Sequence, residues 1–247
     1  MPPYNKTMKF FSERSAHNYK SEKTRLKFKN INHYILYLYP TFTKEINTCP
    51  FASSACKKAC LVNCGRGALK NVIEARKNRT QKIATDFEQS CKQIIAEIAS
   101  LTIYNKMSGG GQSVFRINGT SDLDFSCIWN NPELENLGAI FCEYTKNPFR
   151  MNDFLNSAFS PNVHFTFSYS GKNWNFCKLV LDRGGNVAVP FTCEKLPKVY
   201  KGYEVINGDE HDLRYMDGKK GVIVGLIAKG NKEKIKNGVK QGFFVAC

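Results

Sequence analysis

The segment of this sequence with the clearest chemistry is a short loop that contains four cysteines, Cys49, Cys56, Cys60 and Cys64. The first three follow the spacing Cys-x6-Cys-x3-Cys. Thiolates are the ligands that soft metal centres such as iron–sulfur clusters and zinc prefer. Since so many thiols in one loop make a poor disulfide framework, the segment predicts a metal centre, with Cys49, Cys56 and Cys60 as its ligands.

The number of thiolate ligands decides which metal centre fits the loop. A cubane [4Fe–4S] cluster has four irons, so three protein thiolates would leave one iron open to a substrate, a cofactor or water. Cys64 follows Cys60 by four residues, and as a fourth ligand it would close a structural zinc site. The paired Cys-x2-Cys spacing typical of zinc sites is absent, which favours the cluster. Thiols that hold no metal are the remaining alternative.

A second group of chemically active residues is the run Asp209, Glu210, His211 and Asp212, which places three carboxylates around one imidazole. Such a group suits general acid/base catalysis or the support of metal ligands. We therefore predict these four residues as catalytic. The alternative is a polar turn that follows the turn-forming pair Asn207-Gly208.

Polar residues at other predicted strand ends are candidates for binding a cofactor. Asn118, Ser121 and Asp122 could bind its polar groups, or Ser121 and Asp122 could cap a helix. Lys146 and Lys229 could meet a phosphate or a carboxylate, although surface solvation explains either lysine equally well.

Hydrophobic periodicity indicates the elements that must position these residues. Seven runs rich in β-branched and aromatic residues predict strands, and several are nearly continuous in apolar residues, as in strands covered on both faces. These runs are 33–39, 113–118, 139–144, 163–168, 186–191, 203–206 and 221–227. A helical pattern spans 67–102 and can break near 79–82, and shorter helices are expected at 125–130, 132–137, 152–158 and 174–182.

The alternation of these strands and helices predicts an α/β protein with a mainly parallel sheet. Seven strands in this order suggest a complete or partial (β/α) barrel, with the cysteine loop after the first strand. The carboxyl ends of parallel strands share one rim, where α/β proteins place their sites. We expect the cysteines and the polar strand ends to meet there. Residues 1–32 are predicted as a basic irregular N-terminal arm, and residues 33–247 as one barrel-like domain.

The 247-residue chain carries a formal net charge of +15. Such a charge favours a nucleic acid or nucleotide partner, and a solvated basic surface is the alternative. The sequence has no 18-residue apolar run and no apolar segment typical of a secretory signal, so we expect no membrane span and a cytoplasmic location. In that compartment the ten cysteines would be free thiols or metal ligands.

Several motifs together resemble a known family. They are Thr48-Cys-Pro-x-Ala-Ser-x-x-Cys-x-x-x-Cys60, Arg116-x-x-Gly-x-Ser-Asp122, Tyr144-Thr-Lys146, Gly208-Asp-Glu-His-Asp-Leu-Arg214, Gly221-Val-Ile-Val-Gly225 and Ala228-Lys-Gly230. Over residues 33–245 the chain resembles the phage and plasmid "gene product 88" domain family, which implies a viral or mobile-element origin and a shared site but no particular reaction. The layout is also similar to that of radical S-adenosylmethionine enzymes, without their usual Cys-x3-Cys-x2-Cys spacing.

Two functions follow from this sequence. The first is an iron–sulfur enzyme with an open iron at the barrel mouth, acting with S-adenosylmethionine on a nucleotide or nucleic acid in the cytoplasm of a phage host. Lewis-acid chemistry at the open iron is its alternative reaction. The second is a non-catalytic nucleic-acid-binding protein with a structural zinc or iron–sulfur site. The sequence leaves the oligomeric state open.

Overall fold

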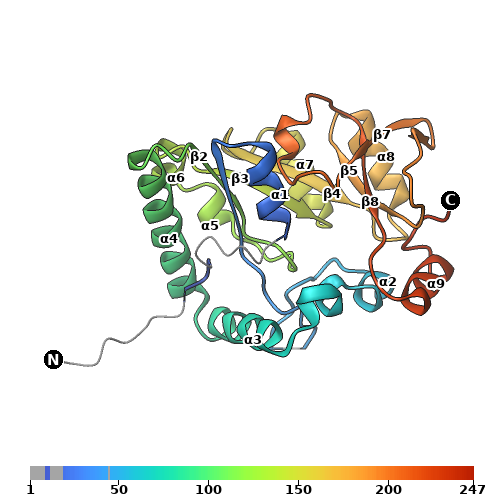
Figure 1. Ribbon diagram of the computed structural model, residues 1–247, viewed down its shortest axis with the longest axis horizontal. Coiled ribbons are helices and arrows are strands. Elements are labelled where there is room, and N and C mark those ends of the chain that lie inside the picture. The colour runs from blue at the N-terminus through green and yellow to red at the C-terminus, as the bar shows by residue number, and fades with distance from the viewer. Residues whose placement is uncertain (1–8, 12–18, 44) are drawn as a thin grey trace.

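The computed structural model describes residues 9–11, 19–43 and 45–247. Their centre is an eight-stranded sheet with the strand order β1-β2-β3-β4-β5-β8-β7-β6 (Figure 1). All neighbouring strands are parallel except β6, which runs antiparallel to β7. The strands are β1 (Ile31–Ile35), β2 (Gln112–Arg116), β3 (Ile140–Thr145), β4 (Val163–Ser168), β5 (Val187–Phe191), β6 (Val199–Tyr200), β7 (Tyr203–Asn207) and β8 (Ile223–Ile227).

This arrangement confirms the α/β class with a mainly parallel sheet. The sheet is open, because no pairing within the described part of the chain joins β1 to the opposite edge. The strand order also differs from chain order after β5. There β8 pairs with β5, starting with Val187 opposite Ile223, and thereby separates β5 from β7.

The helices cover the sheet and the end at which its parallel strands finish. Figure 1 shows α2, α3 and α9 near the end of the sheet toward which β1 and β8 run. The α-helices are α1 (Tyr19–Lys27), α2 (Ser54–Lys58), α3 (Lys70–Thr85), α4 (Phe87–Met107), α5 (Ser126–Trp129), α6 (Pro132–Asn136), α7 (Pro148–Leu155), α8 (Trp174–Asp182) and α9 (Lys232–Lys240). Three 3-10 turns are η1 (Leu61–Asn63), η2 (Gly65–Ala68) and η3 (Arg214–Met216).

The predicted long helix over 67–102 is in fact two helices. The break falls at Asp86, outside the expected interval 79–82. Asp86 has extended backbone angles, and its carboxylate accepts a hydrogen bond of 2.9 Å from Gln89 N. It therefore acts as the N-cap of α4, and the free backbone amide that it satisfies explains the position of the break.

The first strand is shorter than predicted. β1 ends at Ile35, and the chain then continues through Leu36 and Leu38, which are fully buried but lie outside the strand. A continuous run of apolar residues predicts that a segment is buried. It does not predict the residue at which pairing with the neighbouring strand ends. The predictions also missed β6, α2 and α9.

The N-terminal region is more ordered than the predicted irregular arm. Helix α1 lies within it, and Phe10 and Phe11 are buried in the main core. The Glu97 carboxylate of α4 accepts hydrogen bonds of 2.9 and 3.0 Å from the backbone amides of these two residues. The arm prediction was therefore wrong for these segments, since adjacent phenylalanines supply an apolar anchor. Most other residues before Tyr19 lie outside the described residues.

The main core lies between the sheet and a set of helices that includes α4, α7 and α8. Ile94 and Ile98 of α4 and Phe115 and Phe141 of β2 and β3 are all fully buried. Each such side chain contributes about 1.5–3 kcal/mol when it leaves water. This packing holds the central strands rigidly, so that the loops at their carboxyl ends start from fixed positions.

Two cysteines that the sequence analysis left as thiols form a disulfide. Cys193, just after β5, bonds with the terminal Cys247. The pairing of Phe191 with Val245 brings the C-terminal segment alongside β5 and so places these cysteines together. The prediction of free or metal-bound cysteines was therefore wrong for this pair. None of the helices in the described ranges has the length and apolar character that a bilayer span requires.

Candidate functional site

A cavity of about 890 Å³ lies at the carboxyl ends of the parallel strands. Residues that follow β2, β3, β4, β7 and β8 form one side of it, and the segment from Cys49 to Arg79 forms the other. Phe243 and Phe244 from the C-terminal segment also contribute to its wall. The rim expected from the sequence is therefore a real cavity, and all four cysteines of the loop line it.

The cysteine loop is tied to the sheet by short-range and long-range hydrogen bonds. Ser53 is the N-cap of α2, and its Oγ accepts from Cys56 N at 3.0 Å and donates to Ser170 O at 2.6 Å. Asp122 N donates to Thr48 O at 2.7 Å. These bonds join the loop to the ends of β2 and β4, and so fix the backbone that carries the thiols.

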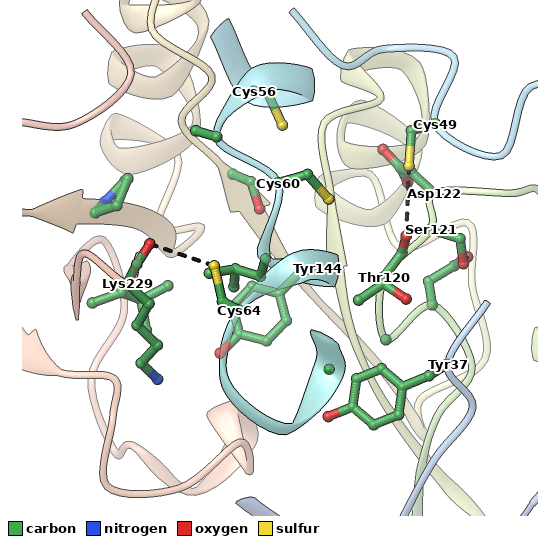
Figure 2. A pocket seen from close by; sticks show the side chains of 18 of the residues that line it. Tyr37, Cys49, Cys56, Cys60, Cys64, Thr120, Ser121, Asp122, Tyr144 and Lys229 are labelled. Carbon is green, nitrogen blue, oxygen red and sulfur yellow. Dashed lines mark hydrogen bonds between the residues drawn. The ribbon is translucent and has the colours of Figure 1, made fainter. Parts of the chain in front are cut away.

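Cys49, Cys56 and Cys60 face a common space. Figure 2 shows the sulfurs of Cys56 and Cys60 pointing toward the region that Cys49 borders from the opposite side. Burial raises the pKa of Cys49 to about 12 and also raises the pKa of Cys60. The charge of Lys146 opposes both shifts, so its ammonium group lies within electrostatic reach of both sulfurs.

The pKa of Lys146 depends on the charge of all three thiols. Burial by itself would lower the pKa of Lys146, but negative charge on Cys56, Asp122, Cys49 and Cys60 outweighs burial and raises it. The lysine that the sequence marked as a binding residue is therefore placed to offset negative charge on the three cysteines.

Cys64 belongs to a different part of the wall. Its sulfur accepts a hydrogen bond from Lys234 Nζ at 3.2 Å and lies 3.9 Å from Lys229 O, toward α9 and the end of β8 (Figure 2). The negative charges that raise the pKa of Lys146 most are those of Cys56, Asp122, Cys49 and Cys60. Lys234 Nζ also donates to Cys60 O, so this lysine joins Cys60 and Cys64. Cys49, Cys56 and Cys60 therefore lie within electrostatic reach of Lys146, while Cys64 contacts Lys234 and Lys229.

The thiols are not arranged as a finished coordination sphere. In the described residues, no group of three or more His, Cys, Asp or Glu side chains is placed so that it could hold a metal ion. Cys49, Cys56 and Cys60 line the same cavity. The donor set has the chemistry of a soft-metal site, three thiols beside one cation.

With this geometry in view, the chain can be compared with known proteins. The sequence profile of gene product 88 matches residues 10–245. The chain belongs to the gene product 88 family. The match confirms the resemblance seen in the motifs and extends it to Phe10, one of the two buried phenylalanines before α1. No curated protein and no solved structure matches the chain.

In this gene product 88 protein the predicted cofactor residues after β2 line the cavity but bond with one another and with their neighbours. Asn118 Oδ1 accepts from Ser121 Oγ at 2.6 Å and from Leu123 N at 3.0 Å. Asp122 forms an ion pair of 2.6 Å with Arg150 and accepts from Lys146 N at 2.8 Å. These bonds fix the conformation of the loop after β2, so the loop forms a rigid part of the cavity wall.

The four predicted catalytic residues do not form one cluster. Asp209 lines the cavity, where it pairs with Lys229 at 3.0 Å and accepts from Ile227 N at 2.7 Å. Glu210 lies half exposed against Lys27 on the surface. The turn predicted as the alternative explains the divergence, because Asp209 N donates to Asn207 Oδ1 at 3.0 Å and successive side chains then point in different directions.

The other two residues of that run do not line the cavity, and His211 is half-buried while Asp212 is buried. His211 Nδ1 lies 3.0 Å from Arg214 Nη2, and its ring packs edge-on against Phe28. Burial and the charge of Arg214 lower the pKa of His211 to about 4, so its imidazole is neutral at neutral pH. Asp212 is fully buried and forms an ion pair of 3.2 Å with Arg116.

Sequence reasoning missed several residues of the cavity wall. Arg116 stacks on the ring of Tyr144 at 4.4 Å, and both line the cavity with Tyr37. Arg76 and Arg79 of α3 line it as well. These two arginines were not missed: they lie three residues apart on the helix that follows the cysteine loop, and this spacing predicts that both can face the loop or a nucleic-acid backbone.

Proposed function

We propose that this gene product 88 protein is an iron–sulfur enzyme, in which Cys49, Cys56 and Cys60 hold a [4Fe–4S] cluster with one iron open to the cavity. The observation that carries the proposal is the three-to-one division of the cysteines. Three thiols line a common space beside Lys146, while Cys64 bonds with Lys234. Three thiolates are the number that leaves a cubane cluster one open iron.

The surrounding residues suit such a centre. Once bound, the cluster would supply an open Lewis-acidic and redox-active iron. Lys146 would offset the negative charge of the thiolates, and metal binding would drive the deprotonation of thiols that burial keeps neutral. The pair of Asp209 and Lys229 would face a bound substrate from the end of β8.

The same proposal includes S-adenosylmethionine as co-substrate and a nucleotide or nucleic acid as substrate. It takes the sheet as a partial (β/α) barrel, because β1 to β5 are parallel and adjacent in chain order and the cysteine loop follows β1. A cavity of about 890 Å³ is within the size range of small-molecule sites and has room for a nucleoside. The formal charge of +15 favours an anionic substrate in the cytoplasm of a phage host.

Anaerobic purification tests this proposal. The protein should be brown, should show a broad visible absorbance shoulder, and should contain iron and acid-labile sulfide in equal amounts. A colourless preparation that lacks iron after anaerobic reconstitution would reject the cluster. Zinc in place of iron would support a structural metal.

The alternative function is a non-catalytic nucleic-acid-binding protein with a structural zinc or iron–sulfur site. It is favoured by the packing of the lysine-rich α9 against α2, which gathers basic residues from distant parts of the sequence. It predicts binding to single-stranded DNA or RNA whose affinity falls steeply as salt rises. Such binding, together with a zinc content that depends on Cys64, would favour the alternative over the enzyme.

A further inference from the structure

The α3 side of the cavity carries a group of positively charged side chains. Arg76 and Arg79 line this side, and Arg66 of η2 lies beside them on the same wall. Among the described residues that line the cavity, the carboxylates are Asp122 and Asp209. Asp122 pairs with Arg150 at 2.6 Å and Asp209 with Lys229 at 3.0 Å, so both are already neutralised on the far side.

Arg76 is the most informative residue of this wall. Its side chain is held over the ring of Tyr37, with the guanidinium carbon 4.7 Å from the ring centre. The residue is only 9% exposed, and its Nη1 atom is buried without a hydrogen-bond partner in the described structure. Burial lowers the pKa of Arg76. A buried guanidinium group with an unsatisfied N–H is costly to the fold, and an anionic ligand in the cavity would offset its positive charge.

The local backbone makes room for this guanidinium. A Cβ atom at Gly67 would lie 3.2 Å from Arg76 Nη1 and 2.9 Å from Val62 O, so a side chain there would crowd the arginine. Arg79 lies three residues further along α3, and its Nε donates to Lys9 O at 3.4 Å. Two guanidinium groups therefore share one helix face beside the cavity.

We propose that Arg76 and Arg79 form an anion subsite that binds the phosphate of a nucleotide, either free or within a single strand. A guanidinium group offers several N–H donors in one plane, which matches the oxygens of a phosphate. The subsite deepens the proposed function and rests on it for the role of the nucleotide as substrate. Its position also limits how the substrate lies, with the phosphate against α3 and the nucleoside toward the strand ends.

The nearest competing role for Arg76 is to neutralise the cysteine thiolates. Negative charge on Cys60 would raise the pKa of Arg76, so the two groups lie within electrostatic reach. Lys146 already serves that role for all three cysteines, since their charges raise its pKa. If Arg76 served the cluster instead of a phosphate, its loss would remove iron and leave nucleotide affinity unchanged.

Titration calorimetry on the full chain tests the subsite with thymidine, thymidine 5′-monophosphate and inorganic phosphate. We expect the monophosphate to bind at least about tenfold more tightly than thymidine, and Arg76→Gln to remove that difference. Arg76→Lys keeps the charge but loses the planar donors and should be intermediate. Arg183→Gln is the matched control, because Arg183 is an exposed arginine of the α8 end that bonds with Asn152 and Asn156.

The outcomes separate this subsite from the metal centre. Iron content and circular dichroism are measured for every variant, and Arg79→Gln, at a less buried position, provides a second test should Arg76→Gln not fold. Phosphate-dependent binding that persists in Cys49→Ser protein without iron would support the subsite even if the cluster proposal fails. Equal affinity for thymidine and its monophosphate, or loss of iron without loss of nucleotide affinity in Arg76→Gln, would overturn the subsite.

An oligothymidylate identifies the source of the phosphate. Tighter binding of the oligonucleotide than of the monophosphate, with a steep decrease as salt rises, would assign the subsite to a phosphate within a strand. Binding of the monophosphate at least as tight as that of the oligonucleotide would assign it to a free nucleotide.

Discussion

Two buried arginines, Arg150 behind the loop after β2 and Arg76 on the α3 wall, show most clearly how the surroundings of the cavity differ from one side to the other. Arg150, near the loop after β2, and Arg76, on α3, are 6% and 9% exposed, and each stacks on an aromatic ring at 4.9 and 4.7 Å, Trp129 and Tyr37 respectively. Arg150 forms an ion pair of 2.6 Å with Asp122, whereas no acidic partner lies beside Arg76 in the described structure. Arg150 therefore forms part of the structural framework through its ion pair, whereas Arg76, at similar burial, can still bind an anionic ligand.

The contrast extends beyond the arginines. On the β2–β3 side, Asn118 and Ser121 bond with each other, and Glu143 accepts from Ile117 N and Asn118 N at 2.6 and 3.1 Å. On the opposite side, the buried Nη1 atom of Arg76 has no hydrogen-bond partner in the described structure, and the Cys49 thiol makes only a long contact of 3.8 Å with Thr120 O. This difference suggests that the first side fixes the shape of the cavity and the second side binds its ligands.

The largest expected effect is the loss of the ion pair on the scaffold side. Arg150→Met should lower the free energy of unfolding by about 3–5 kcal/mol, because it leaves the buried Asp122 carboxylate without its partner. Arg76→Met should cost far less or even stabilise the ligand-free protein, since it removes a buried charge that has no partner. Urea denaturation of both variants measures the difference. An equal decrease in the free energy of unfolding for the two variants would contradict the proposed difference between Arg150 and Arg76.

A smaller effect should appear in the pH dependence of stability. Burial raises the pKa of Glu143 from 4.5 to about 7, so the folded state binds a proton that the unfolded state releases between these values. The free energy of unfolding should therefore fall as pH rises from about 4.5 to about 7, by about 1–3 kcal/mol. Glu143→Gln should remove this decrease. Glu135→Gln, at an exposed position of α6, is the control, and the same slope in all three proteins would contradict the assignment.

Much of the fold was predictable because continuous apolar runs mark strands that are buried on both faces. β4 was predicted with its observed bounds, and α8 likewise. What the sequence did not reveal depended on tertiary partners. The two-residue β6 has no pattern of its own, and the Cys193–Cys247 disulfide depends on a pairing between residues 54 positions apart.

The candidate site was predictable to a similar extent. A loop between a first strand and its helix must lie at the carboxyl end of a parallel sheet, so the placement of Cys49, Cys56 and Cys60 on the cavity followed from topology. The side chains from Asp209 to Asp212 do not form one group, because Asp212 pairs with Arg116. Arg116 lies 96 residues away in the sequence, so local spacing gives no sign of this pair. Whether the residues of a short polar run form one catalytic group therefore depends on long-range ion pairs, which the local sequence does not reveal.

The iron content of four single variants, purified anaerobically, tests the central claim most directly. The account predicts that Cys49→Ser, Cys56→Ser and Cys60→Ser each lose the cluster and its visible absorbance, while Cys64→Ser retains both. Retention of full iron by any of the first three, or loss of iron in Cys64→Ser to the same degree, would contradict it.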